Sequence, residues 1–580
     1  ARRGAEGRAD VPRLDRFLLT GGSMVTMPDS GRIGERARWA ARRSVRAGRG
    51  GDGPTPLFAP CLGITALAMA VPMLHALSEG DERTARAFLH GALFTGFAAA
   101  IMAVALSGRG RAHATQTELT TLILSWILLP AFMAIPLVIL TPQLGWTGAW
   151  FEMVLSFTTT GSTVYVNPSL IEESVHLWRG IVAWMGGLAT LTAAYVILAP
   201  RRMGGFEVTT LSFTLSDQTS SAVRLAELGV QAPGSGGRVR RAVRIILPIY
   251  AGMTAALILL FGMVQEPSLS TVVHALGTMS TAGVSPSADG IASEGSIPLE
   301  IIAALFLCAA ATSRLYGDAS RIGATVPMRH DPELQLMALI VIGATALLFL
   351  RHWAAALTLE NPESQGDALL ALWGALFTVL SFLTTTGYES AAWESAEAWA
   401  GLSNPSLILL GLCALGGGAA TTAGGIKLIR AAVLLRHGIR EVERLAQPNA
   451  VRARGDGPAS ASGISEGAFL GWAFIMLYSG SIFAVTLALA ASGLPFPTAL
   501  PAAIASVSNT GPAFGAVAEG HTTFALLDPL QRVIAAAGMI IGRVETLAVI
   551  AVFRRDAWLR PFFSEKTTGN GRRQLPKSPR

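Results

Sequence analysis

Four short turns rich in Thr or Ser, each containing one glycine, are the segments of this 580-residue sequence best suited to ion chemistry. Their glycines, at positions 161, 283, 387 and 511, stand 122, 104 and 124 residues apart. Period and position agree, so the turns predict an internal fourfold repeat. The four segments are Thr159-Thr160-Gly161-Ser162, Thr281-Ala282-Gly283-Val284, Thr385-Thr386-Gly387-Tyr388 and Asn509-Thr510-Gly511-Pro512.

Backbone carbonyl groups would carry the chemistry of these turns. Glycine allows dihedral angles closed to other residues, which lets successive carbonyls point the same way. Four such segments around one axis would supply rings of oxygen atoms that replace the hydration shell of a monovalent cation. Ligand sets made only of oxygen suit alkali cations and not soft metals. One such turn alone would be an ordinary loop, but four copies at near-regular intervals predict an ion pathway.

The elements that must position these turns are long and apolar. Hydrophobic residues make up 51% of the chain and charged residues only 14%, whereas soluble domains carry about 25% charged residues. This composition excludes a string of soluble domains, because apolar runs of membrane-spanning length recur. The ten predicted spans are 58–78, 87–107, 117–140, 176–199, 243–264, 298–316, 333–350, 404–436, 467–492 and 526–553. Half-helices too short to cross, such as Gly148–Phe157 and Leu370–Leu383, precede the turns.

We therefore predict an all-α polytopic membrane protein. Four pseudo-repeats of span, re-entrant pore helix, filter segment and span surround a central pore, because non-helical backbone at membrane depth must be buried in protein or line water. Two additional spans precede the repeats. By residue number we expect a basic disordered cytoplasmic tail (1–55), the additional spans (56–113), repeat 1 (114–202), a linker and repeat 2 (203–325), repeat 3 (326–445), a linker and repeat 4 (446–553), and a basic cytoplasmic tail (554–580).

Charge is distributed unevenly along the chain. The first 50 residues hold 12 Arg and five acids, and residues 554–580 hold eight basic and two acidic residues. Positive ends on an apolar body predict that both termini are cytoplasmic. A basic nucleic-acid-binding arm is disfavoured, because no soluble domain accompanies it. The segments 245–313 and 352–426 contain acids but no Lys or Arg, which indicates an outer face that attracts cations or, equally, simple exclusion of positive charge from translocated loops.

A glycine-rich interruption and a few charges stand out within the spans. Residues 415–425 contain five glycines, which disfavour helix, so we expect this stretch to unwind below the turns; close helix packing is the alternative. Lys427, one of only three lysines, either tunes cation passage or reaches the membrane surface. Arg543 and Glu545 lie in an apolar span, where charge is costly and usually functional, although they could form a structural ion pair. Glu152 is expected to cap the first half-helix.

The motifs together resemble those of the Trk/Ktr/HKT superfamily of potassium transporters, most closely the TrkH-type bacterial potassium uptake subunit. The resemblance covers residues 58–553. Besides the four glycine turns, it rests on three stretches: Trp178-Arg179-Gly180 with Trp184-Met185-Gly186-Gly187, the run from Gly416 to Lys427, and Gly542-Arg543-Val544-Glu545. The second repeat departs from the family pattern, because it lacks the Thr triplet and its inner span ends in Thr312-Ser313-Arg314-Leu315-Tyr316.

The resemblance implies a selectivity filter and a gate. The implied filter, whose carbonyls would bind K+, consists of Thr159, Thr160, Gly161, Ser162, Thr281, Ala282, Gly283, Val284, Thr385, Thr386, Gly387, Tyr388, Asn509, Thr510, Gly511 and Pro512. The implied gate consists of Gly416, Gly417, Gly418, Ala419, Ala420, Thr421, Thr422, Ala423, Gly424, Gly425, Lys427 and Arg543. In this superfamily a Ser in place of the first filter glycine accompanies sodium selectivity. All four positions here are Gly, which implies a preference for potassium.

The resemblance also implies a homodimer in the bacterial inner membrane, in contact with lipid and with a cytosolic nucleotide-binding regulatory subunit of the TrkA type. It implies K+ as the transported ion, no covalent cofactor and no nucleic-acid partner, and leaves open coupling to H+ or Na+ in a symport. The alternatives are a less selective or sodium-conducting transporter and a polytopic membrane enzyme. The enzyme is disfavoured, because the nine His residues are scattered and none has a metal-ligand spacing with Cys or another His.

Overall fold

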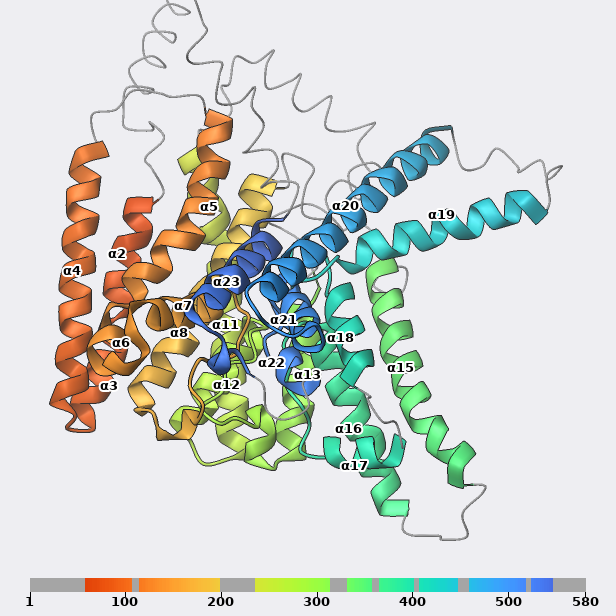
Figure 1. Ribbon diagram of the computed structural model, residues 1–580, viewed down its shortest axis with the longest axis horizontal. Coiled ribbons are helices and arrows are strands. Elements are labelled where there is room, and N and C mark those ends of the chain that lie inside the picture. The colour runs from red at the N-terminus through yellow and green to blue at the C-terminus, as the bar shows by residue number, and fades with distance from the viewer. Residues whose placement is uncertain are drawn as a thin grey trace, which may run out of the picture. The chain divides into compact units, whose positions relative to one another are not determined.

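The computed structural model describes residues 58–106, 114–198, 235–312, 331–356, 365–400, 406–446, 458–517 and 523–545 (Figure 1). These residues belong to one compact unit that spans 53–580. They contain α-helices and short irregular helices but no β-strand. The two predicted basic tails lie outside the described residues. Within the described part of the chain, the predicted all-α fold is confirmed.

Three helices correspond to the two additional N-terminal spans. They are α2 (Phe58–Ala68), α3 (Ala70–Ser78) and α4 (Glu82–Leu106). Helices α2 and α3 pack along α4, and a turn that begins at Glu79 joins α3 to α4. Large apolar side chains such as Leu67 and Phe97 remain exposed on these helices, as expected for surfaces in contact with lipid rather than water.

Four times, a long helix is followed by a shorter buried helix and then by a third helix. In the first set these are α5 (Ala114–Met133) with α6 (Ile135–Leu140), then α7 (Gly145–Phe157), then α8 (Glu173–Ala193) with a π-helical continuation (Ala194–Leu198). In the second set they are α11 (Ser235–Val264), α12 (Leu269–Met279) and α13 (Ile297–Ala310). In the third set they are α15 (Pro332–Ala356), α16 (Gln365–Leu383), and α18 (Ser406–Leu415) after the short α17 (Trp393–Ala400). In the fourth set they are α20 (Pro458–Ala491), α21 (Phe496–Ser508), and α23 (Pro529–Val544) after the short α22 (Pro512–Val517).

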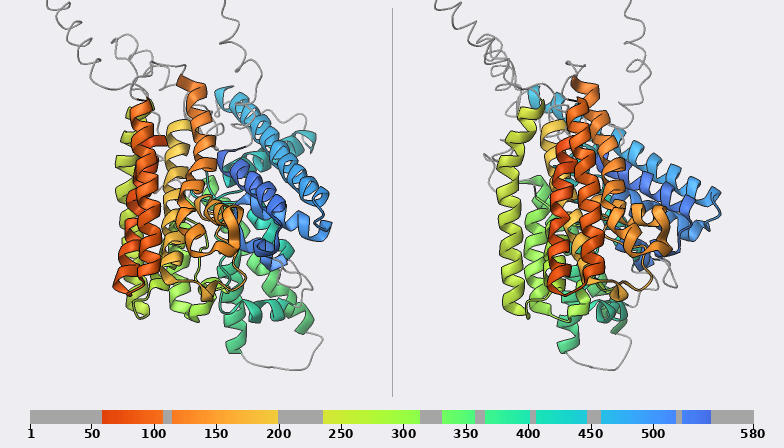
Figure 2. Two further views of the ribbon diagram at one scale, coloured as in Figure 1. Left: turned by 60° about the vertical axis from the view of Figure 1, so that its left-hand side comes forward. Right: turned by 90° about the vertical axis from the view of Figure 1, so that its left-hand side faces the viewer.

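Six of the described helical segments are long and apolar enough to cross a membrane. They are Phe58–Ser78, Glu82–Ala105, Thr121–Leu140, Val239–Val264, Glu333–Leu350 and Ala468–Ala491. Helices α2, α4, α5 and α11 run nearly parallel to one another, whereas α20 is inclined to them (Figure 2). The helices that follow the turns are shorter or interrupted, which is why α13, α18 and α23 fall below spanning length. Short 3₁₀ turns connect several elements: Pro142–Leu144, Pro168–Leu170, Gly290–Glu294 and Phe524–Leu526.

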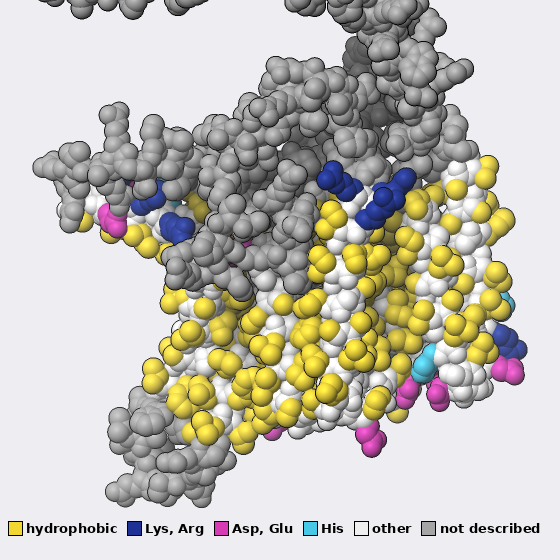
Figure 3. Space-filling view, turned by 180° about the vertical axis from the view of Figure 1, so that it is seen from behind, with side chains coloured by type: hydrophobic (Ala, Val, Ile, Leu, Met, Phe, Trp, Pro, Cys, Tyr) yellow, Lys and Arg dark blue, Asp and Glu magenta, His cyan; other side chains and the backbone are white. Residues whose placement is uncertain are grey.

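The apolar band of these helices has different charges at its two edges. Figure 3 shows most Lys and Arg along one edge of the visible face and Asp and Glu predominantly along the opposite edge, where one group of Lys or Arg side chains lies beside them. Helix α11 illustrates the pattern, because exposed Arg240, Arg241 and Arg244 lie near its start and exposed Glu266 follows its end. At 1.5 Å per residue, its apolar stretch between Arg244 and Glu266 is about 30 Å long, the thickness of a bilayer core.

One predicted span is divided in the structure. Residues 404–436 do not form a single crossing, because α18 ends at Leu415 and helix α19 (Leu428–Ala446) starts only after twelve non-helical residues. Helix α19 extends sideways from the bundle (Figure 1). It is amphipathic, with Leu435 and Ile439 exposed on one face and arginines on the other. The last predicted span is shorter than expected in the described residues, because α23 ends at Val544 and Glu545 has a left-handed backbone (φ 67°).

Candidate functional site

Four buried short helices deliver the four glycine turns. The helices are α7, α12, α16 and α21, and the turns that follow are glycine segment 1 (residues 159–162), segment 2 (281–284), segment 3 (385–388) and segment 4 (509–512). The helices α7 and α16 begin at Gly145 and Gln365, earlier than the predicted half-helix starts at Gly148 and Leu370. Their final turns are nearly inaccessible to solvent, so the glycine segments lie within protein and not at its surface.

Each glycine segment begins with a residue in the left-handed region of the backbone map. The φ angles are 53° at Thr159, 51° at Thr281, 59° at Thr385 and 56° at Asn509, always two residues before the segment's glycine. Left-handed residues other than glycine are uncommon, so four in one register show that the turns share a local conformation. The glycines alone do not indicate this second special position; the recurring Thr or Asn two residues earlier was the available signal for it.

A hydrogen bond also recurs in all four turns. The amide of the residue before the glycine donates to a carbonyl five residues earlier, at 2.8–2.9 Å. The four pairs, donor first, are Thr160–Leu155, Ala282–Gly277, Thr386–Ser381 and Thr510–Ala505. Segment 2, which departs from the family pattern in sequence, therefore has the same backbone turn as the others.

The four segments converge on a common centre. A Cβ atom at Gly161 would overlap the Ala282 carbonyl oxygen, and one at Gly283 would overlap the Thr386 carbonyl oxygen. A Cβ at Gly387 would lie 3.0 Å from Pro512 of segment 4, and one at Gly511 would lie 2.8 Å from the Thr160 oxygen of segment 1. The contacts thus run from segment 1 to 2, 3, 4 and back to 1. Only residues without a side chain permit this approach, which is a physical reason for glycine at these positions.

Segment 4 differs from the other three at its glycine. Gly161, Gly283 and Gly387 have φ angles of 84°, 67° and 79°, whereas Gly511 does not have a positive φ. Its amide donates a 2.6 Å hydrogen bond to the Thr160 carbonyl of segment 1. The Asn509 side chain makes a second link to segment 1, since its Nδ2 donates to the Thr160 hydroxyl at 3.3 Å. The fourfold arrangement is therefore approximate.

The glycine-rich interruption forms a buried loop beside the first residues of the glycine segments. We name the end of each segment where it begins its inner end, and the end where it finishes its outer end. Residues 416–427 lack helix, as the sequence predicts, and Gly416, Ala420 and Gly425 have left-handed backbone angles. Two backbone amides of the loop donate hydrogen bonds to neighbouring elements: Gly418 N to Ala311 O (3.1 Å) and Ala419 N to the Glu333 carboxylate (2.9 Å). These contacts tie the interruption to α13 and α15, so it is a structured loop.

The loop touches the start of three glycine segments. The Thr281 hydroxyl donates to the Thr422 hydroxyl at 3.0 Å, and the Gly424 amide donates to the Thr385 hydroxyl at 2.8 Å. A Cβ at Gly424 would overlap the Ser508 carbonyl just before segment 4. In segments 2 and 3 the left-handed residue itself, Thr281 or Thr385, is hydrogen-bonded to the loop.

Arg543 joins the loop to segment 1. Its side chain is buried, and its guanidinium donates to the Thr158 carbonyl, the Thr159 hydroxyl and the Thr422 carbonyl. The Arg543 side chain therefore contacts segment 1 and the loop. The alternative of an Arg543–Glu545 ion pair is not found among the described residues, since Glu545 pairs with Arg430 of α19 at 3.1 Å.

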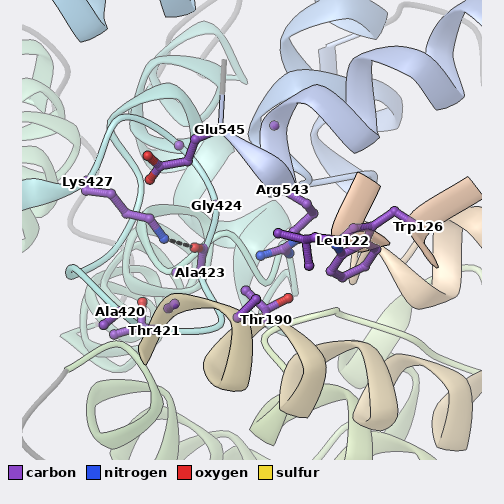
Figure 4. A pocket seen from close by; sticks show the side chains of 14 residues that line it. Leu122, Trp126, Thr190, Ala420, Thr421, Ala423, Gly424, Lys427, Arg543 and Glu545 are labelled. Atoms are coloured by element: carbon purple, nitrogen blue, oxygen red, sulfur yellow. Dashed lines mark hydrogen bonds between the residues drawn. The ribbon is translucent and has the colours of Figure 1, made fainter. Parts of the chain in front are cut away.

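A small cavity of about 30 Å³ lies beside this loop, large enough for one or two water molecules. Lys427 and Arg543 stand on either side of Ala423 and Gly424 at this cavity (Figure 4). The Lys427 ammonium donates to the Ala423 carbonyl, so it binds the loop and does not extend to the membrane surface. Leu122 and Trp126 of α5 and Thr190 of α8 form another part of the wall (Figure 4).

Buried carboxylates brace the outer ends of the glycine segments. Glu152 lies inside α7 and does not cap it: its carboxylate accepts the Val164 amide at 2.7 Å and pairs with Arg179 at 2.5 Å. This corrects the prediction of a capping role. Glu300 of α13 has an equivalent task after segment 3, where it accepts the Ala391 amide (2.7 Å) and the Ser390 hydroxyl (2.6 Å).

Arg179, Glu300 and Arg430 were not predicted as site residues, although Arg179 stands in a motif of the resemblance. Their partners are far away in sequence: Glu300 is 91 residues from Ala391, and Arg430 is 115 residues from Glu545. A charged residue within an apolar span was the available signal for each.

Comparison with known proteins identifies the family. The family model named TrkH, described as a cation transport protein, matches residues 85–314 and 332–558. The potassium uptake protein TrkI of Halomonas elongata is 29% identical over 502 residues, which cover 85% of this chain and 94% of that protein. TrkH of Escherichia coli is 26% identical over 441 residues, which cover 75% of this chain and 84% of that protein.

A solved structure has the same fold. The crystal structure of the potassium transporter TrkH from Vibrio parahaemolyticus superposes with a TM-score of 0.68 at 22% identity, covering 87% of this chain and 98% of that chain. Together with the family match over most of the sequence, this leads to one conclusion: the chain belongs to the TrkH family of cation transport proteins.

Proposed function

We propose that this chain takes up K+ across the bacterial inner membrane through a filter formed by the four glycine segments. The observation that carries the proposal is their convergence in cyclic order, with one backbone turn repeated four times. Its named relatives TrkH and TrkI are potassium uptake proteins, transporters and not enzymes. A dehydrated cation needs oxygen ligands on several sides, and the four segments offer carbonyls around one centre.

The carbonyls of Thr160, Ala282, Thr386 and Thr510 are the ligands we assign to the ion. Each precedes a filter glycine. The oxygens of Thr160, Ala282 and Thr386 lie close to the glycine of a neighbouring segment, whereas the Thr510 oxygen accepts the Ala513 amide at 3.2 Å. The Thr160 oxygen also accepts the Gly511 amide, but a carbonyl has two lone pairs and can do both. Glycine at all four positions favours K+ over Na+, since no side chain displaces a carbonyl of the neighbouring segment.

The buried loop and Arg543 constitute the gate in this proposal. Residues 416–425, Lys427 and Arg543 lie at the inner side of the filter, and their contacts with Thr158, Thr281 and Thr385 obstruct the exit. A cation leaving the filter would meet a guanidinium, which repels it. The structure therefore suits a closed pathway, and opening requires the loop and Arg543 to move away from the glycine segments.

Orientation and partners follow from charge and from the family. We assign the basic edge of the helix bundle to the cytoplasm and the acidic edge to the outside, which places both termini in the cytoplasm. The boundaries of the tails, additional spans and four repeats remain those predicted from the sequence. We also retain the homodimer, the TrkA-type cytosolic partner, and either passive conduction or symport, as proposals.

The substitution Gly161→Ser tests the filter. A side chain at this position overlaps the Ala282 carbonyl and must displace it, so we expect a lower K+/Na+ selectivity ratio. The measurement is growth of cells deficient in potassium uptake at low external K+, followed by competition between K+ and Na+ in liposomes. Gly343→Ser is a matched control, because a Cβ there has no atom within 4 Å.

Rescue of growth by the unmodified chain and reduced selectivity in Gly161→Ser alone would support a potassium filter. Unchanged selectivity in Gly161→Ser would reject the assignment of the filter. Equal transport of Na+ and K+ by the unmodified chain would favour the alternative of a less selective cation transporter.

A further inference from the structure

Glycine segment 2 lacks a bridge that stabilises the other three segments. In segments 1, 3 and 4, a hydroxyl at the end of the short helix contacts a threonine hydroxyl in the segment. The pairs are Thr158–Thr160 (2.7 Å), Thr384–Thr386 (3.1 Å) and Ser508–Thr510 (3.4 Å). Segment 2 has Ser280 and Ala282 at these positions, and the Ser280 hydroxyl donates back to the Leu276 carbonyl of its own helix. Ala282 has no hydroxyl with which to form the bridge.

A tyrosine from segment 3 contacts this segment. The Tyr388 hydroxyl donates to the Val284 carbonyl at 2.9 Å, and its side chain is only 1% exposed. A Cβ at Gly277 would lie 2.6 Å from the Tyr388 oxygen, so this glycine of α12 makes room for the hydroxyl. The tyrosine therefore reaches across a repeat boundary through a space that fits it.

An arginine from α8 binds the residue that directly follows segment 2. Arg179 Nη1 donates to the Ser285 carbonyl at 3.1 Å, and its Nη2 donates to the Ser162 carbonyl of segment 1 at 3.4 Å. The ion pair with Glu152 fixes the guanidinium, and both side chains are at most 1% exposed. The ring nitrogen Nδ1 of His176 lies 3.0 Å from Nη1. A buried charge held by this many partners is suited to fix position.

We propose that Tyr388 and Arg179 are positioning residues that replace the missing hydroxyl bridge and hold the outer end of segment 2 in the filter. This inference rests on the proposed potassium filter. A ring of carbonyls discriminates K+ from Na+ only while its quarters keep their spacing and number of ligands. Segment 2 depends on its two neighbours for that spacing, whereas segments 1, 3 and 4 also carry their own hydroxyl bridges.

Tyr388→Phe is the sharpest test, because it removes one hydroxyl and keeps the ring. One hydrogen bond corresponds to about a two- to tenfold change in an equilibrium, so we expect the K+/Na+ selectivity ratio in liposomes to fall by up to about tenfold. Tyr478→Phe is the matched control, because Tyr478 is also buried but its hydroxyl has no hydrogen-bond partner within the described residues. A merely structural role would lower the yield of folded protein without changing the selectivity ratio of the protein that folds.

Restoring the missing hydroxyl bridge of segment 2 gives a second test, in which the expected result is a recovery of selectivity and not a further decrease. In Tyr388→Phe combined with Ala282→Thr, a hydroxyl again faces Ser280, so we expect the selectivity ratio to recover. Arg179→Lys keeps the charge but cannot span Glu152, Ser162 and Ser285 together, and we expect it to lower the ratio as Tyr388→Phe does. Arg86→Lys, at the exposed pair with Glu82, controls for this change of side chain.

The outcomes separate this inference from the function on which it rests. A changed ratio in Gly161→Ser together with unchanged ratios in Tyr388→Phe and Arg179→Lys would overturn the positioning role and keep the filter. Unchanged ratios in all three variants would overturn the filter as well. A folded double variant that shows no recovery would contradict the replacement of the hydroxyl bridge by Tyr388.

Discussion

The substitution Arg543→Gln should convert a closed pathway into a leaking one. Arg543 places a buried positive charge at the inner end of segment 1 and joins that segment to Thr422 of the loop. Glutamine removes the charge and retains at most part of the hydrogen bonding. Two obstacles to cation exit are weakened together: the electrostatic repulsion and the attachment of the loop.

The size of the expected change in K+ flux follows from the electrostatic repulsion between Arg543 and the ion. With an effective dielectric constant of about 20, two unit charges repel by about 4 kcal/mol at 4 Å and about 2 kcal/mol at 8 Å. A K+ ion passing Arg543 within that range would be slowed by roughly 30- to 1000-fold, since about 1.4 kcal/mol corresponds to a tenfold change in rate. Other steps limit the total flux, so we expect an increase of at least about tenfold in Arg543→Gln.

The assay is uptake of radioactive Rb+ by liposomes that contain the purified chain without a cytosolic partner. Arg543→Lys preserves the charge and should remain close to the unmodified chain in flux. Size-exclusion profiles and thermal unfolding establish that the variants are folded. A folded Arg543→Gln protein with the flux of the unmodified chain would refute Arg543 as a barrier, and equal leakage in Arg543→Lys would refute the electrostatic explanation.

Three further predictions concern the loop, a buried ion pair and an outer carboxylate. Deleting Gly416–Gly418 should raise Rb+ flux without a partner, because the Gly418–Ala311 hydrogen bond that holds the loop is lost; an unchanged flux would argue against gating. Glu545→Gln should lower the free energy of unfolding by about 1–3 kcal/mol, because it weakens the charged hydrogen bonds to buried Arg430, whereas Glu82→Gln at an exposed pair should change it by less than about 1 kcal/mol. Equal shifts in thermal unfolding would contradict this. The hydrogen bond with His274 lowers the pKa of Glu294 to about 2. The ionised Glu294 carboxylate therefore stabilises the fold above about pH 4.5, and this contribution is lost as the pH falls through 2. The unfolding temperature of Glu294→Gln should depend less on pH between these values than that of the unmodified chain.

The sequence was sufficient for the positions of the turns and for the broken helix. Glycine and threonine at regular intervals indicate conformation directly, and five glycines in residues 415–425 disfavour helix irrespective of the neighbouring elements. Both predictions depend on local backbone preferences. Six of the ten predicted spans reach spanning length in the described residues and were predictable from local length and composition, whereas 298–316, 404–436 and 526–553 form shorter or broken helices.

The bracing contacts were not predictable, because they depend on which elements pack together. Glu152 is a residue type that often caps helices. Its partners Val164, which follows segment 1, and Arg179, which lies in α8, reach it only through the folding of the chain. Glu545 is near Arg543 in sequence, yet packing of α19 presents Arg430 to it. The place of the broken stretch against α13 and α15 likewise depends on long-range hydrogen bonds of the loop, although the break itself is local.

The position of bound Tl+, a heavy substitute for K+, would test the central claim most directly. Anomalous diffraction from crystals grown with Tl+ should reveal ions on the axis between the carbonyls of Thr160, Ala282, Thr386 and Thr510. Excess K+ should displace them, and the same concentration of Na+ should not. Tl+ bound elsewhere with none on this axis, or equal displacement by Na+ and K+, would contradict a potassium filter formed by the four glycine segments.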